Sequence, residues 1–307
     1  MRNEEILVQI IILNWNGYEL TKDCLNSLSR LDYQNYKVIV VDNGSTDGSY
    51  KKLVSEFPAI EFLAIEANLG FADGNNAAIL HTREKYNPQL FLLLNNDTTV
   101  EPTFLRKMVD TFSSNPNAGI LGNKIYYYED PQRIWFAGGQ FNKFLGDGIH
   151  LGIDQLDIGQ FNDQKKIDFV TGCCMMISKD VINKIGLLDS SFFAYCEDLD
   201  YSLRASKAGY VITYVPDAII YHKVSSSFKT KDKKQFGARS NLAYYLNVRN
   251  RLFIYRKHKE RIKPLYFFIH QVKYVSRYLI GFFITLQFGK VKSVLQGLWD
   301  GVSKPMV

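Results

Sequence analysis

An apolar run that ends in Asn-Asn-Asp is the feature that most constrains this sequence of 307 residues. Residues 90–94 are Leu-Phe-Leu-Leu-Leu, and Asn95, Asn96 and Asp97 follow directly. An uninterrupted run of this length predicts a strand that is buried on both faces, as in a parallel sheet. Because open α/β sheets bind ligands beyond the carboxyl ends of such strands, Asp97 is expected at the rim of a ligand site. Two interpretations stay open: a carboxylate that holds Mg²⁺ or Mn²⁺, or an ordinary Asn/Asp turn.

Strands and helices are predicted to alternate over the first third of the chain. Apolar, β-branched runs predict the strands, and the longer patterned stretches between them predict helices. This alternation is typical of βαβ units, so the fold class is expected to be α/β with a mostly parallel central sheet flanked by helices. The expected strands are 6–13, 38–41, 60–65 and 90–94, and the expected helices are 18–30, 48–57 (capped by Thr46 or Asp47) and 72–85.

The second third of the chain has a weaker pattern. Glu197 and Asp198 are expected to open a helix that ends near Lys207, because acidic residues in a first turn complement the helix dipole. The other expectations are short strands and long loops over 118–170, a buried strand at 170–177, and strand-like stretches at 210–214 and 218–221 before His222.

The formal charge of +6 hides two regions of opposite sign. From Lys223 to the end, 18 Lys and Arg face 3 Asp and Glu, a net of +15, whereas residues 1–222 hold 19 basic and 28 acidic residues, a net of −9. Such an asymmetry predicts two parts with different roles, residues 1–222 and residues 223–307.

The basic region is predicted to end in one amphipathic helix. Its apolar positions recur every three or four residues, and Lys273 and Arg277 lie off this stripe. The charges interrupt the apolar run well short of a membrane span. A helix on an anionic membrane surface, a helix packed on the protein's own core and a homodimer contact all fit the pattern, whereas no nucleic-acid motif accompanies the charge. The stripe is Leu265, Phe268, Val272, Val275, Leu279, Phe282 and Leu286.

Cysteine usage and the amino terminus both predict a cytoplasmic protein. Cys24, Cys173, Cys174 and Cys196 include no spaced CxxC pair, so neither a disulfide framework nor a zinc site is expected. The apolar stretch 6–13 lacks the small-residue cleavage site of a signal peptide. The basic tail adds the expectation of peripheral attachment to the cytoplasmic face of the membrane.

Six segments, in this order, resemble the family 2 inverting glycosyltransferases of GT-A fold. The resemblance covers residues 6–227, and its branch is that of bacterial rhamnosyltransferases of surface polysaccharide synthesis. Each segment alone is a weak signal, and the order of all six carries the resemblance. The segments are 41–49 (Val-Asp-Asn-Gly-Ser-Thr-Asp-Gly-Ser), 68–76 (Asn-Leu-Gly-Phe-Ala-Asp-Gly-Asn-Asn), 94–98 (Leu-Asn-Asn-Asp-Thr), 170–175, 192–204 and 221–223.

The resemblance implies how a nucleotide sugar is held. Asp42 matches the carboxylate that accepts a hydrogen bond from the pyrimidine base, and an acceptor-only group suits the ring N–H of uracil or thymine. Trp15 flanks the base in one interpretation and belongs to the core in the other. The remaining residues implied to bind the nucleotide sugar are Asn14, Asn68, Asn75, Asn95 and Asn96.

The resemblance also implies a metal cofactor. Asp97 matches the last acidic residue of the DXD motif, which holds Mn²⁺ or Mg²⁺ against the diphosphate. Asn95 and Asn96 depart from that motif, so a weaker metal site is expected. His222 matches a histidine that completes the metal shell in some members, with an ordinary surface or core histidine as the alternative.

Catalysis is implied for the acidic pair at the predicted helix start. Asp198 matches the general base that takes the proton of the acceptor hydroxyl, and Glu197 either holds the acceptor or exchanges roles with it. The alternative is that both acids only favour the helix start. The resemblance therefore predicts that Asp42, Asp97 and Asp198 line one cleft, and that the anomeric centre is inverted.

The implied donor is dTDP-rhamnose first and a UDP-hexose second, and the implied acceptor is a glycan or a lipid-linked glycan. A sugar-nucleotide pyrophosphorylase is disfavoured, because its Gly-rich, Arg- and Lys-bearing loop is missing after the first strand. A dehydrogenase is disfavoured because Gly70 and Gly74 form no GxGxxG after a strand. The intact Asp97 and Asp198 argue against a non-catalytic nucleotide-binding membrane adaptor.

Overall fold

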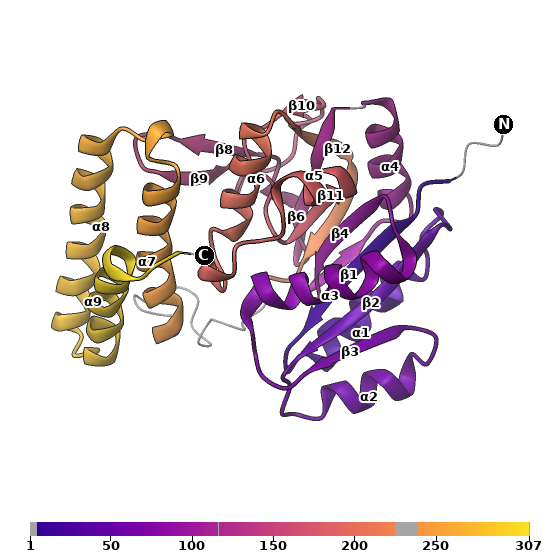
Figure 1. The fold of residues 1–307 in the computed structure, drawn as a ribbon, viewed down its shortest axis with the longest axis horizontal. Helices are drawn as coiled ribbons and strands as arrows, with labels where there is room; N and C mark the ends of the chain where they lie inside the picture. Colours follow the sequence, from indigo (N-terminus) through magenta and orange to yellow (C-terminus); the bar gives the residue numbers. More distant parts are fainter. Residues whose placement is uncertain (1–4, 116, 225–238, 307) are drawn as a thin grey trace.

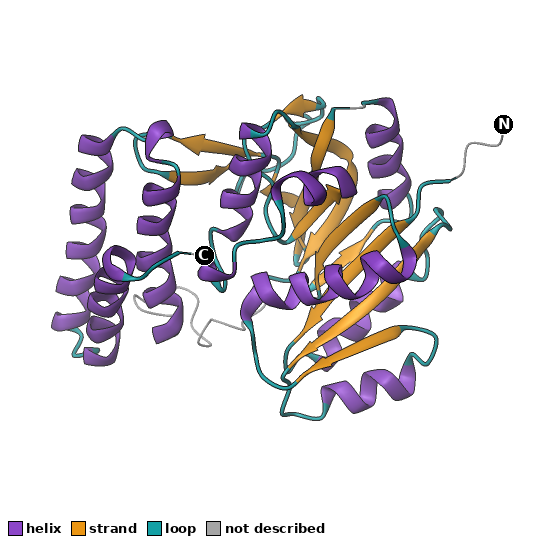
Figure 2. Ribbon diagram, in the orientation of Figure 1, coloured by secondary structure: helices purple, strands orange, loops and turns teal. Residues whose placement is uncertain are grey.

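A computed structural model describes residues 5–115, 117–224 and 239–306. Its centre is a large mixed sheet with helices packed on both faces, and a group of three C-terminal helices lies beside it (Figure 1 and Figure 2). The strands are β1 (Val8–Asn14), β2 (Tyr36–Asn43), β3 (Glu61–Ile65), β4 (Leu90–Asn95), β5 (Thr98–Val100), β6 (Ala118–Tyr127), β7 (Asp130–Phe136), β8 (Gly139–Asn142), β9 (Asp147–His150), β10 (Lys165–Lys166), β11 (Cys174–Ser178) and β12 (Val211–His222). The α-helices are α1 (Tyr18–Leu28), α2 (Ser49–Glu56), α3 (Gly70–Tyr86), α4 (Phe104–Ser114), α5 (Lys179–Ile185), α6 (Glu197–Lys207), α7 (Asn241–Lys257), α8 (Pro264–Ile284) and α9 (Phe288–Ser303).

The strand order of the large sheet is β10-β12-β6-β11-β4-β1-β2-β3. β1 runs parallel to both β2 and β4, and β2 runs parallel to β3, so the expected βαβ units are confirmed. β11 is antiparallel to both of its neighbours, β4 and β6. In the parallel register Asn14 is paired with Asp42, and Leu13 is paired with Asn95. The polar residues that end these three strands therefore share one edge of the sheet.

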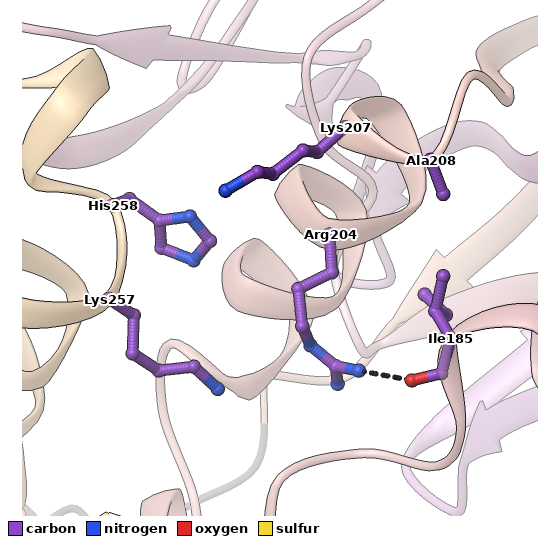
Figure 3. Close-up of a pocket in the computed structure, with 6 residues that line it drawn as sticks. All are labelled: Ile185, Arg204, Lys207, Ala208, Lys257 and His258. Atoms are coloured by element: carbon purple, nitrogen blue, oxygen red, sulfur yellow. Dashed lines mark hydrogen bonds between the residues drawn. The ribbon is translucent and has the colours of Figure 1, made fainter.

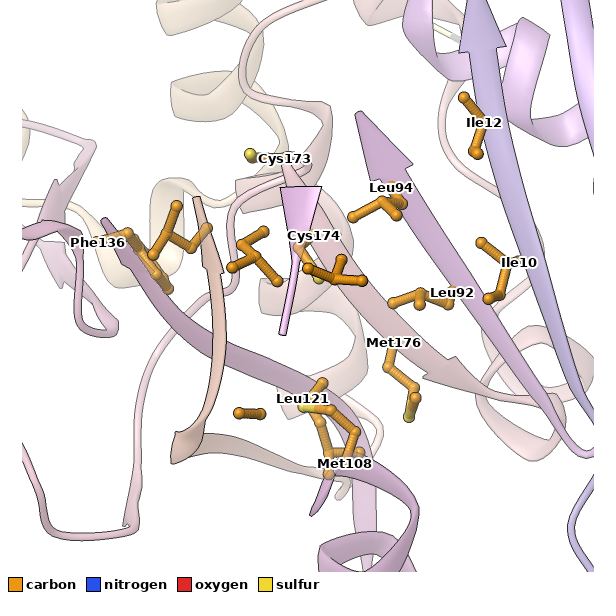
Figure 4. Packing of buried hydrophobic residues seen from close by; sticks show 14 of the residues in the cluster. Ile10, Ile12, Leu92, Leu94, Met108, Leu121, Phe136, Cys173, Cys174 and Met176 are labelled. Atoms are coloured by element: carbon orange, nitrogen blue, oxygen red, sulfur yellow. The ribbon is translucent and has the colours of Figure 1, made fainter. Parts of the chain in front are cut away.

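The apolar run of residues 90–94 is buried on both faces, as predicted. Alternate residues of β1 and β4 enter two hydrophobic clusters, one shared with α1 and α4 and the other with α3 and α5. The first cluster contains Ile10, Ile12, Leu92 and Leu94 together with sulfur-containing side chains of neighbouring elements, among them Cys174 and Met176 of β11 (Figure 4). Full burial of such a side chain contributes about 1.5–3 kcal/mol. This burial fixes which ends of the strands carry the polar residues.

Three predictions from local sequence were wrong, because strand pairing or an unusual backbone conformation determines the structure at those places. The region expected to hold only short strands, 118–170, contains the ten-residue β6, which is buried over most of its length. The expected strand at 170–177 begins only at Cys174, because the residues before it form a turn. α2 is capped by Gly48 at φ 79° instead of Thr46 or Asp47, since the chain enters the helix through a left-handed conformation that glycine adopts at little cost.

The predicted C-terminal stripe does not form one packing face. α8 ends at Ile284, and Leu286 follows it at φ 54°, so the stripe runs past the helix. Val275 and Phe282 of the stripe are buried, whereas Leu265 and Val272 are 69% and 65% exposed. In residues 5–115, 117–224 and 239–306, every helix falls short of the length and apolarity needed to cross a membrane. Residues 225–238 of the basic region lie outside the described residues.

Candidate active site

Asn14 and Asp42 form a buried polar pair at the carboxyl ends of β1 and β2. The Nδ2 atom of Asn14 donates to Oδ1 of Asp42 at 2.8 Å and to Oγ of Ser49 at 3.0 Å. The backbone N–H of Ser45 donates to the other carboxylate oxygen of Asp42 at 3.1 Å. Asp42 is 5% exposed. A carboxylate has about four lone-pair sites, so Asp42 is held in place and retains the capacity to accept a ligand N–H.

A hydrogen-bond relay connects this pair to the Asn-Asn-Asp motif. Thr21 donates from Oγ1 to Oδ1 of Asn14 at 2.8 Å, and Asn96 donates from Nδ2 to Oγ1 of Thr21 at 2.9 Å. Gly17 makes room for this approach, since a Cβ atom there would lie 2.8 Å from Nδ2 of Asn96. We call the group formed by Asn14, Asp42 and Asn96 the strand-end rim.

Asp97 and His222 are brought together by strand pairing across the sequence. β5 pairs antiparallel with β12, which places His222 opposite Thr98, and the N–H of Lys223 donates to the carbonyl of Asp97 at 2.8 Å. Nε2 of His222 lies 3.1 Å from Oδ1 of Asp97. His222 is 7% exposed, and the ring of Trp135 stands edge-on to it with centroids 4.5 Å apart. The imidazole is therefore fixed against the carboxylate.

Glu197 and Asp198 open α6, as predicted, in different environments. The backbone N–H of Gly172 donates to Oδ2 of Asp198 at 2.8 Å, and the N–H of Leu199 donates to Oδ1 at 2.7 Å. Asp198 is half-buried, whereas Glu197 is 5% exposed, and within the described chain Oε2 of Glu197 has no hydrogen-bond partner. Burial raises the pKa of Asp198, and burial together with the charge of Asp198 raises the pKa of Glu197 well above its usual range.

The turn before β11 connects the Asp97 and Asp198 sites. The N–H of Asn95 donates to the carbonyl of Cys173 at 2.9 Å, and the adjacent Gly172 holds Asp198. Burial raises the pKa of the Cys173 thiol, and the negative charges of Asp97 and, less strongly, Asp198 raise it further. The residues next to Asp97 are therefore hydrogen-bonded on one side to the turn that holds Asp198 and on the other, through Thr21 and Asn14, to Asp42.

The other predicted ligands occupy varied positions. Trp15 is 41% exposed, so the interpretation that it belongs to the core is wrong. Asn68 uses its Oδ1 atom to accept the N–H of Gly70 at 2.8 Å. Asn75 is 1% exposed and donates from Nδ2 to the carbonyl of Phe71 at 2.8 Å, so its amide serves its own helix. Asn95 contributes the backbone bond to Cys173 described above.

Sequence reasoning missed three residues that hold the rim. Thr21, Ser45 and Ser49 position Asn14 and Asp42 through the bonds given above. Ser45 and Ser49 lie within the segment 41–49, for which the resemblance implied a role for Asp42 and none for the hydroxyl groups. Thr21 carries no local signal, since it looks like any polar residue of a helix. All four cysteines are free thiols in the structure.

A pocket of about 440 Å³ lies away from these acids, between α6 and α7. Figure 3 shows Arg204 of α6 facing Lys257 and His258 at the end of α7. Arg204 donates to the carbonyls of Ile185 and Leu187 at 2.9 and 2.8 Å and to Asp200. Lys257 is likewise paired with Asp200, and Lys207 with Glu260, so the lysine and arginine charges of this pocket are paired within the protein. The candidate active site is therefore the sheet edge that carries the acids.

Comparison with known proteins finds a matching family model and several named relatives. Residues 9–186 match the family described as Glycosyl transferase family 2, a span that includes Asp42 and Asp97 and ends before Glu197. The N-acetylglucosaminyl-diphospho-decaprenol L-rhamnosyltransferase of Mycobacterium tuberculosis is 26% identical over 227 residues, 66% of this chain and 72% of its own. The dTDP-rhamnosyl transferase RfbF of Shigella flexneri is 24% identical over 234 residues, 76% of this chain and 75% of its own.

Solved structures show the same architecture. The structure of GalNAc-T7 with UDP, GalNAc and Mn²⁺ has a TM-score of 0.63 at 12% identity, covering 83% of this chain and 48% of that chain. This chain thus spans about half the length of that structure. At such an identity the likeness concerns the fold, which is the GT-A fold with a helical C-terminal extension.

Proposed function

This chain belongs to glycosyl transferase family 2 and is a glycosyltransferase, and from that premise we propose that it transfers a rhamnosyl group from dTDP-rhamnose to a hydroxyl group of a glycan. A UDP-hexose is the second donor to consider, and a lipid-linked glycan of surface polysaccharide synthesis is the acceptor that the named relatives suggest. The observation that carries the proposal is the series of hydrogen bonds that runs from Asp42 through Asn14 and Thr21 to Asn96, and from Asn95 to the turn that holds Asp198.

The strand-end rim is the proposed nucleotide site. Asp42 accepts the ring N–H of thymine or uracil, while Asn14 and the Ser45 N–H hold its carboxylate in place. Trp15, exposed at the end of β1, supplies a flat apolar surface for the base. Asn95, Asn96 and Asn68 remain proposed contacts to the diphosphate and sugar.

The Asp97–His222 pair is the proposed metal site. Carboxylate oxygen and imidazole nitrogen are both ligand types for divalent cations, and the two atoms converge to 3.1 Å. Within the described chain, no group of three or more His, Cys, Asp or Glu converges, so diphosphate oxygens and water would complete the shell. A bound Mn²⁺ or Mg²⁺ would act as a Lewis acid that neutralises charge on the leaving diphosphate.

Asp198 is the proposed general base. Its carboxylate is oriented by the N–H groups of Gly172 and Leu199, and it is more exposed than Glu197. It takes the proton of the acceptor hydroxyl while that oxygen bonds to the anomeric carbon. The bond from the anomeric carbon to the diphosphate oxygen breaks on the opposite face, so dTDP leaves and the configuration inverts. Glu197, buried beside it, is a candidate to hold the acceptor.

A donor panel tests the proposal. The purified protein is incubated with a nucleotide sugar (dTDP-rhamnose or a UDP-hexose), a glycan acceptor and Mn²⁺, and release of the nucleoside diphosphate is measured. We expect acceptor-dependent release that is largest with dTDP-rhamnose. Release with a UDP-hexose alone would move the donor to the second candidate, and acceptor-independent or absent release with every donor would contradict transfer.

The C-terminal part is proposed to lie on an anionic membrane. We place the catalytic part at 1–222 and the helical extension at 223–307. Four apolar side chains at the end of α8 and the start of α9 are more than half exposed: Phe283, Ile284, Leu286 and Phe288. Across α8 and α9 the sole acidic residue is Asp300, which is paired with Lys304. Because two such basic faces would repel, an anionic lipid surface fits better than a homodimer.

Vesicle binding tests the membrane proposal. Replacing Phe283, Ile284 and Phe288 with serine should release the protein from vesicles that contain anionic lipid. The matched control is Ile158→Ser, because Ile158 is 86% exposed but lies far from these helices in the sequence. Unchanged co-sedimentation of the triple variant would contradict the proposal, and a concentration-dependent dimer that the triple variant loses would favour the homodimer.

A further inference from the structure

The loop that leads into α6 is held in an unfavourable backbone conformation. Phe193, Tyr195 and Cys196 have φ angles of 64°, 70° and 69°, and none of them is glycine. Such a conformation is unfavourable for a residue with a side chain and persists only where surrounding contacts impose it. Glu197 and Asp198 follow directly, so the strained loop determines where both acids point. We call residues 192–196 the α6 loop.

Asn250 of α7 provides those contacts. Its Nδ2 atom lies 2.7, 2.8 and 3.0 Å from the carbonyl oxygens of Tyr195, Ala194 and Phe192. Asn250 is 0% exposed, so these bonds are shielded from water. A side-chain amide has two N–H groups, which here serve three carbonyls of the same loop. One buried side chain thus binds most of the α6 loop.

Neighbouring residues fix the orientation of this amide. Arg249 donates from Nε to Oδ1 of Asn250 at 2.9 Å, which turns the Nδ2 group toward the loop. Arg249 also donates from Nη2 to the carbonyls of Ser191 and Phe192, both at 2.8 Å. The opposite side of the loop is held by α3, because the N–H of Phe71 donates to the carbonyl of Phe193 at 2.6 Å.

A buried ion cluster fastens α7 to α6 itself. Asp200 is 0% exposed, and it accepts Nε of Arg204 at 2.8 Å and contacts Nε2 of His258 at 2.8 Å and Nζ of Lys257 at 3.1 Å. Figure 3 shows three of these partners facing one another across the gap between the two helices. Part of the basic charge of the C-terminal region therefore serves to hold the helix that carries Asp198.

We propose that Asn250 is a positioning residue for the transfer reaction. It holds the α6 loop in the left-handed conformation that aims Asp198 at the acceptor, although it lies about fifty residues further along the chain. It does not touch the substrate. The inference rests on the proposed function of Asp198, and it makes α7 part of the catalytic machinery rather than a separate appendage.

Substitution of Asn250 tests the proposal. Asn250→Ala removes the amide that donates to three carbonyls of the loop, and Asn250→Ser leaves a single hydroxyl donor on a shorter side chain. We expect kcat to fall about 100-fold for alanine and less for serine, since a displacement of about 1 Å at a reacting group has that effect. KM for the nucleotide sugar and the affinity for dTDP should change by less than about threefold. Asn247→Ala is the matched control, because Nδ2 of Asn247 donates to the carbonyl of Ala243 in its own helix and, among the described residues, to no carbonyl of the loop.

A second readout keeps this inference separate from the proposed function. Hydrogen exchange at the backbone amides of residues 193–199 should accelerate in Asn250→Ala and stay unchanged in Asn247→Ala, whether or not the donor has been identified. If alanine prevents folding, the serine variant gives the same two measurements. Unchanged kcat and exchange would overturn the proposal, as would an equal loss of kcat and of dTDP affinity.

Discussion

The strand-end rim and the α6 loop are held by different means. Asn14, Asp42 and Asn96 lie at the carboxyl ends of strands that neighbour one another in the sheet, and short polar bonds within the first hundred residues fix them. The α6 loop has a strained backbone that is fixed by Asn250, a residue of α7. The nucleotide end of the proposed site is therefore a property of the sheet, whereas the acceptor end depends on the C-terminal helices.

Replacing the proposed base, Asp198, should give the largest effect, because it lowers kcat without changing dTDP affinity. Asp198→Asn keeps the shape of the side chain but cannot take a proton, so kcat should fall by about 10²–10⁴-fold while dTDP affinity stays unchanged. Steady-state kinetics and calorimetry measure the two quantities. The control is Asp180→Asn, which removes an exposed acid from the first turn of α5. A similar loss in both variants would show that the acids only stabilise helix starts.

Replacing Asp97 should weaken nucleotide binding and leave the conformation of the α6 loop unchanged. Asp97→Ala removes one charged contact to the metal and diphosphate, so dTDP affinity in the presence of Mn²⁺ should weaken about ten- to hundredfold. Without Mn²⁺ the affinity should hardly change. Asp130→Ala is the control, since Asp130 is a surface acid paired with Arg133. An equal loss with and without Mn²⁺ would argue against coordination by Asp97.

The pH dependence of catalysis should reveal the environment of α6. Burial raises the pKa of Asp198, so the protonated, inactive form persists to a higher pH than for an ordinary aspartate with a pKa of about 3.9. We expect kcat to rise with pH across an acid limb that lies above that value. A pH-rate profile measures this limb, and a limb at or below 3.9 would contradict the assignment of Asp198.

Glu197→Gln should give the smallest effect of these substitutions, a change in thermal stability. Burial raises the pKa of Glu197, so ionisation costs more in the folded than in the unfolded chain, and this cost grows as pH rises above the unfolded pKa of about 4.3. Removing the charge should therefore raise Tm at pH 7 by a few degrees and change it little at pH 4. Glu84→Gln, at an exposed site, is the control. A lower Tm at pH 7 would indicate a stabilising partner for the Glu197 charge.

The sequence predicted the parts of the site that follow from strand ends and helix starts. The βαβ order placed Asp42 and Asp97 correctly, because buried apolar runs specify which strand ends carry polar residues. The start of α6 at Glu197 and its end at Lys207 were predicted as observed. β6 was missed, since its burial depends on pairing with β11 and β12, and that pairing leaves no local pattern.

Other features of the site depend on contacts that no local pattern reveals. The left-handed conformation of Phe193 and Tyr195 contradicts their own preferences and exists because distant groups impose it. Asn250 and Arg249 looked like members of a basic tail, yet both are buried and bonded to the α6 loop. The exposure of Trp15 likewise could be decided only by the folded chain.

The most direct measurement is a crystal structure of the protein with dTDP and Mn²⁺. We expect thymine in hydrogen-bond contact with Asp42, the diphosphate and metal beside Asp97 and His222, and the carboxylate of Asp198 facing the open end of the diphosphate. Binding of dTDP elsewhere, such as in the pocket beside Arg204 between α6 and α7, would contradict it.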